Sequence, residues 1–297
     1  MTKEEVTYEQ IVEGLREKLP SLPQILDDLV KTLGNLNITL DEIEEQIRID
    51  QSISLEILKV VNKGEFLEIE EKRITSISDA IHKLGFENIQ KIIMNVMVLP
   101  FFSDTKFPPF FKVESLWKHC VGVALASHVI SDFLEYGDND RAYACGLLHD
   151  IGKVAKINFD AKSFSKELLS AKRKKMTICE MEIVRKLLRH DILGGLIANQ
   201  WAMPNELCQT IRWHHTESRE DRGELEDPEV HLLVDIVCLA NSLVHKMEFG
   251  SSGHSFHRPP SQKFLKTMGL KEANLVELEE AIRSDWDTKF SYLAIIK

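Results

Sequence analysis

The sequence of 297 residues predicts an all-α protein, and three observations carry that prediction. Glycine and proline, which most often interrupt helices, number only 14 and 9. Leucine, isoleucine and glutamate are frequent, and apolar residues recur at spacings of three and four. We find no sustained strand-like alternation, internal repeat or low-complexity tract. Because 43% of the residues are hydrophobic, burial can offset chain entropy and a mainly disordered chain is excluded.

The first hundred residues are predicted to form short helices. A stripe of apolar residues covers Tyr8–Leu19, and a second covers Ile25–Leu33 before Gly34. Thr39 followed by Glu42 is typical of a capping box at the start of a helix. Further helices are predicted at Ile43–Ile47, Ile53–Val61 and Ser78–Met97.

The segment Leu99–Phe111 interrupts this pattern. Its adjacent prolines, Pro108 and Pro109, forbid a helix, and its aromatic residues indicate a packed connector. We therefore predict two domains, an N-terminal helical domain over residues 1–112 and a second helical domain over 113–297.

Apolar periodicity resumes after the connector. The segment Glu248–Pro260 has the composition of a loop. The predicted helices are Glu114–Glu135, Asp140–Leu148, Phe164–Arg173, Ile178–Trp201, Asn205–His214, Glu229–Met247 and Leu275–Arg283.

The overall charge excludes some classes of partner. The chain has 37 basic and 47 acidic residues, a net charge of −10, which argues against general binding to nucleic acid or to anionic membranes. No run of 18 apolar residues is present, so we expect no membrane span. Five scattered cysteines and a charged N-terminus without a signal peptide indicate a reduced, cytoplasmic protein.

The most informative segment is Gly146–Lys153, which contains the adjacent pair His149 and Asp150. An imidazole and a carboxylate can both bind a divalent metal, and a carboxylate can bridge two ions. Gly152 leaves room for a close approach, which we expect from a ligand. Lys153 either contacts a phosphate oxygen or is a helix C-terminal cation that offsets the macrodipole.

Other histidines follow in an ordered series. His119 and His190 are each predicted to lie within a helix. His214 and His215 end an apolar helix, where fraying would let two adjacent side chains reach one centre. Six ligand-type residues in this order predict a metal site.

The ordered series resembles the HD superfamily of metal-dependent phosphohydrolases, and most closely its HDOD branch, the HD-related output domains of bacterial signalling. The resemblance covers nearly the whole chain. It rests further on Leu19–Pro23, Ile49–Asn62, Ile74–Gly85, His190–Pro204 and Val237–Asn241. It implies an N-terminal HDOD-type helical domain, with a regulatory or partner-docking surface, packed on a C-terminal HD-type domain.

The resemblance also implies a set of metal ligands. One divalent ion would be held by His119, His149 and Asp150, with Asn241 as a candidate fourth ligand. Asp150 would bridge to a second ion held by His190, His214 and His215. Iron or manganese is preferred by resemblance to the dinuclear members, with nickel and zinc as alternatives, and the site would hold one or two ions.

Two departures from the family pattern affect the expected activity. Catalytic HD proteins carry an aspartate where this chain has Asn241, and a neutral amide should weaken binding of a second cation. Asn241 could instead donate a hydrogen bond to a ligand. The Gly-Tyr-Pro signature of cyclic-di-GMP phosphodiesterases does not follow His215, so that substrate is not supported.

The remaining polar residues of this region are interpreted as structural. Asp191 is expected to be solvated, and Asp235 to be a poor substitute for a carboxylate at Asn241. The histidines outside the pattern, of which His254 and His257 are expected to be exposed, are His82, His128, His231, His245, His254 and His257.

Two functions are compatible with these features. The first is a bacterial signal-transduction module whose output is binding, with a structural or sensory metal. The second is a metal-dependent phosphohydrolase acting on a nucleotide or other phosphoester, in which Asp150 and Lys153 are catalytic and a metal-bound water attacks phosphorus. A helical scaffold with vestigial histidines is the third interpretation. Because the resemblance begins at Leu19, input is expected from a separate signalling protein, as yet unknown, or from a phosphorylated small molecule.

Overall fold

The computed structural model describes residues 7–18, 57–58, 60–62, 74–85, 89, 111–200, 203–254 and 256–293. These residues form helices joined by turns and contain no strand, so the predicted all-α class is confirmed. No helix in the described part of the chain is long and apolar enough to cross a membrane. The α-helices are α1 (Tyr8–Lys18), α5 (Ile77–Leu84), α8 (Val113–Phe133), α9 (Asn139–Leu148), α10 (Ile151–Lys174), α11 (Ile178–Val184), α12 (His190–Gln200), α13 (Asn205–Trp213), α14 (Pro228–Lys246), α15 (Gln262–Thr267) and α16 (Glu272–Leu293).

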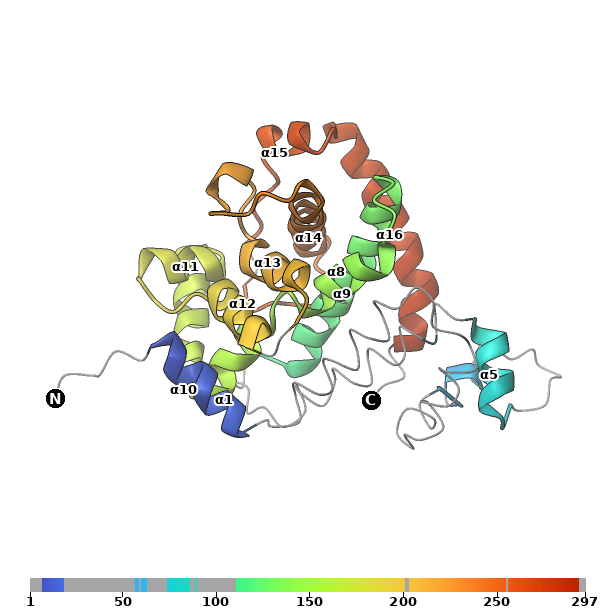
Figure 1. Ribbon diagram of the computed structural model, residues 1–297, viewed down its shortest axis with the longest axis horizontal. Coiled ribbons are helices and arrows are strands. Elements are labelled where there is room, and N and C mark those ends of the chain that lie inside the picture. The colour runs from blue at the N-terminus through green and yellow to red at the C-terminus, as the bar shows by residue number, and fades with distance from the viewer. Residues whose placement is uncertain are drawn as a thin grey trace.

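The core of the described structure is built around α8 and α14. Helix α8 packs against α9, α14 and α16, while α12 packs against α10 and α13 (Figure 1). Helix α14 begins with Pro228 after the N-cap Asp227, whose carboxylate accepts a hydrogen bond from the Glu229 N–H. Most of α14 is buried, including Leu233, Val237 and Leu243, which are fully inaccessible. A central helix of this kind can present side chains to several neighbours at once.

One predicted helix is wrong. The segment Ile178–Trp201 contains two helices, α11 and α12, because the chain breaks between them. Lys186 adopts a left-handed conformation with φ of 52°, and the next N–H bonds back to the Glu182 carbonyl. The apolar spacing continues on both sides of the break, so periodicity alone does not show it. As a result His190 opens a helix instead of lying inside one.

Other predicted boundaries also shift. Helix α10 starts well before Phe164 and has a kink at Asp160, and α16 extends beyond both ends of the predicted Leu275–Arg283. The short α15, capped by Ser261, was not predicted. The described residues of the segment Glu248–Pro260 form no helix, in agreement with its composition.

Helix α1 packs on the C-terminal part of the chain, against α10 and α12 (Figure 1). Ile11 and Val12 are buried in the same apolar cluster as α8 and α14. The Tyr8 hydroxyl accepts a hydrogen bond from the Arg189 N–H at 2.9 Å. The division at residue 112 stays a prediction.

Much of the N-terminal half lies outside the described residues. This holds for the helices predicted at Ile25–Leu33 and Ile43–Ile47, the capping box of Thr39 and Glu42, and the connector up to residue 110. Of the helix predicted at Ser78–Met97, the structure describes α5, capped by the Ser76 hydroxyl, and Ile89.

Gly152 is fixed by backbone packing. A Cβ at this position would lie 1.8 Å from the His190 carbonyl oxygen and 2.8 Å from the Gly194 nitrogen. The close approach that we expected from a ligand is therefore made by α12. This contact brings the start of α12 against the first turn of α10.

Replacing Gly152 with alanine is expected to destabilise the protein by about 3 kcal/mol or more, because backbone atoms cannot move aside cheaply. Gly14 provides the control, since a Cβ there meets nothing within 4 Å and alanine should stabilise α1 by about 0.5–1 kcal/mol. Thermal unfolding of both variants measures the difference. Equal stability of the two variants would contradict the packing at Gly152.

Candidate metal centre

The His149 and Asp150 pair occupies the junction between α9 and α10. His149 follows the last residue of α9, and Asp150 precedes the first residue of α10. Both side chains are inaccessible to solvent. The His149 Nδ1–H donates to the Gly146 carbonyl at 2.7 Å, which leaves Nε2 unprotonated and directed inward. The interruption between the helices lets two adjacent residues reach one centre.

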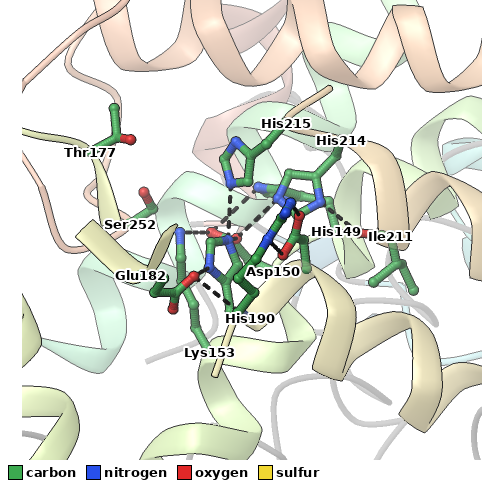
Figure 2. Close-up of polar contacts among 12 residues, drawn as sticks. His149, Asp150, Lys153, Thr177, Glu182, His190, Ile211, His214, His215 and Ser252 are labelled. Carbon is green, nitrogen blue, oxygen red and sulfur yellow. Dashed lines mark hydrogen bonds and ion pairs between the residues drawn. The ribbon is translucent and has the colours of Figure 1, made fainter. Parts of the chain in front are cut away.

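Asp150 lies at the middle of the cluster, and each of its oxygens faces two histidines (Figure 2). Oδ2 lies 3.4 Å from His149 Nε2 and 3.9 Å from His119 Nε2. Oδ1 lies 3.5 Å from His190 Nε2 and 3.6 Å from His214 Nε2. These separations are too long for hydrogen bonds, but atoms that share an ion at about 2.1 Å lie roughly 3–4 Å apart.

His190, the first residue of α12, is oriented by Glu182 of α11. Its Nδ1–H donates to Glu182 Oε2 at 2.7 Å, so its Nε2 is the available ligand atom. Lys156 donates to the other Glu182 oxygen at 2.6 Å. Burial raises the pKa of the Glu182 carboxyl, but its contacts with His190 and Lys156 outweigh burial and lower the pKa to about 2. Burial lowers the pKa of His190, which favours the neutral ring that a metal requires.

His214 and His215 follow the end of α13, as predicted for a frayed terminus. The His214 Nδ1–H donates to the Ile211 carbonyl at 2.7 Å, again leaving Nε2 for the centre. His215 Nε2 lies 2.9 Å from His190 Nε2. Burial lowers the pKa of His215 well below its ordinary value. At this distance the His215 Nε2–H donates to the unprotonated His190 Nε2, and a shift of that proton to His215 Nδ1 would leave two facing lone pairs for one ion.

His119 of α8 and Asn241 of α14 approach from the interior helices. Both are buried, with 1% and 4% of their surface exposed. Five inward-facing atoms are buried and have no hydrogen-bond partner, although such atoms are normally paired. They are His119 Nε2, His149 Nε2, Asp150 Oδ1, His214 Nε2 and Asn241 Oδ1. Unpaired lone pairs in this number fit a bound cation.

Six of the seven predicted ligands therefore lie together, and Asn241 lines a cavity with two of them, His214 and His215. The ligand atoms form two groups, and within each group all of the atoms lie within 4.8 Å of one another. Asp150 belongs to both groups. It is joined by His119 and His149 in one group and by His190, His214 and His215 in the other. This is the division that the resemblance implied. With one carboxylate among many imidazoles, the donors suit iron, manganese, nickel or zinc better than magnesium or calcium.

The position of Lys153 contradicts one of its two sequence interpretations. It lies in the first turn of α10, so it cannot offset the dipole at a helix C-terminus. Its side chain is 1% exposed, and Nζ donates to Asp150 Oδ2 at 2.7 Å. Burial raises the pKa of Asp150, but Lys153 and His149 outweigh burial and hold it well below the ordinary range. Lys153 thus keeps the central carboxylate ionised.

Comparison with known proteins agrees with this geometry. The pattern of the HDOD domain matches residues 19–217. The chain belongs to the HDOD family. The match contains six of the seven predicted ligands and ends before Asn241 and the rest of α14.

Individual relatives of this HDOD chain are distant. An uncharacterized protein of Treponema pallidum (strain Nichols) is 23% identical over 275 residues, which cover 89% of this chain and 51% of the relative. The chain thus spans about half the length of that relative.

Solved structures share the fold. An HDOD domain protein of unknown function from Geobacter sulfurreducens matches with a TM-score of 0.72 and 21% identity over 96% of both chains. A proposed signal transduction protein from Marinobacter aquaeolei VT8 has a TM-score of 0.74 and 15% identity over 99% of this chain and 62% of its own. A proposed phosphohydrolase from Shewanella amazonensis SB2B has a TM-score of 0.68 and 18% identity, and the match covers 97% of this chain and 98% of its own.

Two histidines close to the candidate metal centre, His245 and His254, were interpreted from the sequence as unrelated to it. The His245 ring centroid lies 4.5 Å from that of His119, and the His254 ring lies 4.3 Å from His245. His254 was expected to be exposed, but only 8% of its surface is accessible. The spacing of four residues from Asn241 to His245, one helical turn, is the signal that could have placed His245.

Two carboxylates near the ligands have structural partners. Asp191, expected to be solvated, is fully buried and paired with Arg189. Asp235 is buried and paired with Arg219 and Arg222, which agrees with its exclusion as a ligand. Arg222, also fully buried, donates to the Thr216 carbonyl at 2.9 Å and so ties the segment after His215 to α14.

A cavity of about 120 Å³ opens beside the centre. Its walls come from the His214–His215 turn, from α14, and from the segment after α14. The lining residues are Thr177, His214, His215, Glu217, Cys238, Asn241, Ser242, His245, His254, Phe256, His257 and Arg258. Lys153 is not among them, so its predicted contact with a phosphate oxygen stays a prediction.

Replacing Glu182 with glutamine is expected to weaken metal binding about 10–100-fold, because His190 loses the carboxylate that orients it and raises its basicity. A titration with Mn²⁺ or Fe²⁺ followed by elemental analysis measures the change. Glu206→Gln, a substitution on the first turn of α13, is the control. Unchanged affinity in Glu182→Gln would show that His190 is not a ligand.

Proposed function

We propose that this chain is a bacterial signal-transduction module of the HDOD family whose centre holds one or two divalent metal ions. The observation that carries the proposal is a set of five buried, unpaired atoms, which belong to Asp150, to three histidines beside it and to Asn241. An empty scaffold would leave these polar atoms without compensation for their burial. The name of the Marinobacter relative, a proposed signal transduction protein, supports the same role.

The geometry supports a division of the ligands between two ions. His119, His149 and Asp150, with Asn241, would hold the first ion, and Asp150, His190, His214 and His215 the second. Iron or manganese is our preferred metal, because six neutral donors and one carboxylate suit a borderline ion. Asn241 adds no negative charge, which weakens binding of a second cation and favours a regulatory over a catalytic role.

A second function, phosphoester hydrolysis, is favoured by the cavity beside His214, His215 and Asn241. When bound, a metal ion of this kind lowers the pKa of a coordinated water. Asp150 would hold the ions in place, and Lys153 would keep that carboxylate ionised while offsetting negative charge. The name of the Shewanella relative, a proposed phosphohydrolase, agrees with this alternative.

The proposed partners are a separate signalling protein and a phosphorylated small molecule. The net charge of −10 disfavours nucleic acid and anionic membrane surfaces. We propose a cytoplasmic location, because all five cysteines are free thiols and buried.

One experiment separates the two functions. Metal is measured by elemental analysis of the purified full chain, and hydrolysis is assayed on a generic phosphodiester, a phosphomonoester and a nucleotide panel with added Mn²⁺ or Fe²⁺. Bound metal without turnover supports the signalling module. Turnover that disappears in Asp150→Ala supports the hydrolase, and a chain that binds no metal contradicts both.

A further inference from the structure

The cavity beside the metal centre has a wall that the proposed metal site does not use. This wall consists of His245 from α14 and His254, Phe256 and Arg258 from the segment that follows. All four residues lie beyond position 217, where the match to the HDOD pattern ends. The wall therefore lies outside the part of the chain that matches the HDOD pattern.

The segment that supplies this wall is fixed against α8. Phe249 stacks on Trp286 of α16 with ring centroids 3.8 Å apart. Gly250 has φ of 75°, and a Cβ there would lie 2.3 Å from the His119 nitrogen. The Ser251 N–H donates to the Ser115 carbonyl at 2.8 Å. Because its anchor is the helix that carries His119, the segment holds its side chains at a fixed place relative to the centre.

His245 and His254 form a pair of imidazole rings on this wall, linked through a serine hydroxyl. The Ser252 hydroxyl lies 3.0 Å from His245 Nε2 and 3.5 Å from His254 Nδ1, so it links the two rings. Because the hydroxyl has a single proton, it donates to one ring and accepts the N–H of the other. With His245 as the donor to Ser252 and His254 Nδ1 as the acceptor, the His254 Nε2–H is left to donate to an anionic oxygen.

Arg258 supplies a positive charge at the mouth of the cavity. Its Nε donates to Glu180 Oε1 at 2.7 Å, and its guanidinium lies over the Phe256 ring at 4.8 Å. Glu180 holds Nε and Phe256 covers one face of the guanidinium. The two terminal amino groups can therefore donate a pair of parallel hydrogen bonds to phosphate oxygens. Glu217, the acidic residue of the lining, has its carboxylate directed to the Ser261 N–H at 3.2 Å.

The volume limits the ligand. Sites for drug-sized ligands typically measure about 300–1,000 Å³, whereas this cavity measures about 120 Å³. A nucleobase or a second ester arm would have to remain outside, but one tetrahedral phosphoryl group would fit.

We propose that the cavity is a subsite for the terminal phosphoryl group of a small phosphomonoester. The inference rests on the proposed function, since the ions would attract the anion from one side while His254 and Arg258 bind it from the other. The organic part of the ligand projects outward past Phe256 and Arg258.

The test uses the full chain loaded with Mn²⁺ and inorganic phosphate as the probe. Phosphate affinity is measured by the broadening of the phosphorus NMR signal by nearby Mn²⁺, with metal content measured in parallel. Arg258→Gln and His254→Phe are each expected to weaken phosphate binding about tenfold while metal content stays the same. Arg258 has an exposed side chain, so folding is not at stake in its variant.

Two matched controls remove the same chemical groups elsewhere. Arg283→Gln on α16 and His82→Phe on α5 alter exposed residues and should leave phosphate binding unchanged. Phenyl phosphate should displace the bound phosphate, whereas diphenyl phosphate at equal concentration should not. Unchanged phosphate affinity in both Arg258→Gln and His254→Phe, with metal still bound, overturns the subsite alone. Equal displacement by the diester overturns the monoester assignment, and absence of metal overturns the proposed function itself.

Discussion

An Asp150→Asn variant is expected to lose its bound metal, with affinity for Mn²⁺ or Fe²⁺ reduced by more than about 100-fold. Asp150 is the one carboxylate in both ligand groups, and each of its oxygens faces two histidine nitrogens. An amide at this position is neutral and offers a single acceptor oxygen, so it cannot bridge two cations. Elemental analysis after dialysis against a known metal concentration measures the loss.

The same substitution also affects folding, and the structure indicates how to separate the two effects. Lys153 is 1% exposed, and Asp150 is its ion-pair partner. Without the carboxylate, a buried ammonium group would be left uncompensated, which costs about 3–5 kcal/mol. The double variant Asp150→Asn with Lys153→Met removes both charges. It should recover most of the lost stability while still failing to bind metal.

Asp132→Asn is the matched control for this experiment. Asp132 is exposed near the end of α8, and its carboxylate accepts a hydrogen bond from the Asn139 side chain at 3.1 Å. Its substitution should change neither metal content nor stability appreciably. Normal metal content in the folded double variant would mean that Asp150 is not a ligand.

Arg222→Met is expected to lower the free energy of unfolding by about 3–5 kcal/mol, because it leaves Asp235 buried with only part of its compensation. Arg222 is fully buried and paired with Asp235. It also donates to the His231 carbonyl at 3.0 Å and to the Thr216 carbonyl at 2.9 Å. The thermal midpoint should fall by about 10 °C or more.

An exposed ion pair gives the contrast. Lys263 and Glu220 lie 3.4 Å apart with 74% and 72% of their side-chain surface exposed. Lys263→Met should therefore change stability by no more than about 1 kcal/mol. If the two methionine variants unfolded at the same temperature, the buried network around Arg222 would not stabilise the segment after His215.

The sequence predicted the helical class and identified residues that lie together around Asp150, because both depend on local signals. Apolar spacing identifies helices such as α8 and α14, and the polar residues after His215 mark the end of α13. The break before His190 was missed because it depends on a backbone conformation at Lys186 that no local residue preference requires. The capping box of Thr177 and Glu180 at the start of α11 was present in the sequence, but it marks a beginning and not an end.

The cavity wall could not be predicted from the sequence. His254 follows a loop-like run, and loops are usually solvated, so exposure was the natural expectation. Its burial depends on the packing of Phe249 against Trp286 and of Gly250 against α8, contacts between residues far apart along the chain. The role of Lys153 was similarly hidden, because the start of α10 could not be located from the apolar pattern.

The packing of α1 has a consequence for synthesis of the chain. The Tyr8 hydroxyl and the Arg189 N–H that it meets are separated by 181 residues. At about 5–20 residues per second, the ribosome needs roughly 10–40 s to make the intervening chain. Until α10 and α12 have been made, Ile11 and Val12 lack the surface that buries them in the finished protein. Helix α1 thus leaves the ribosome long before the surface that it packs against.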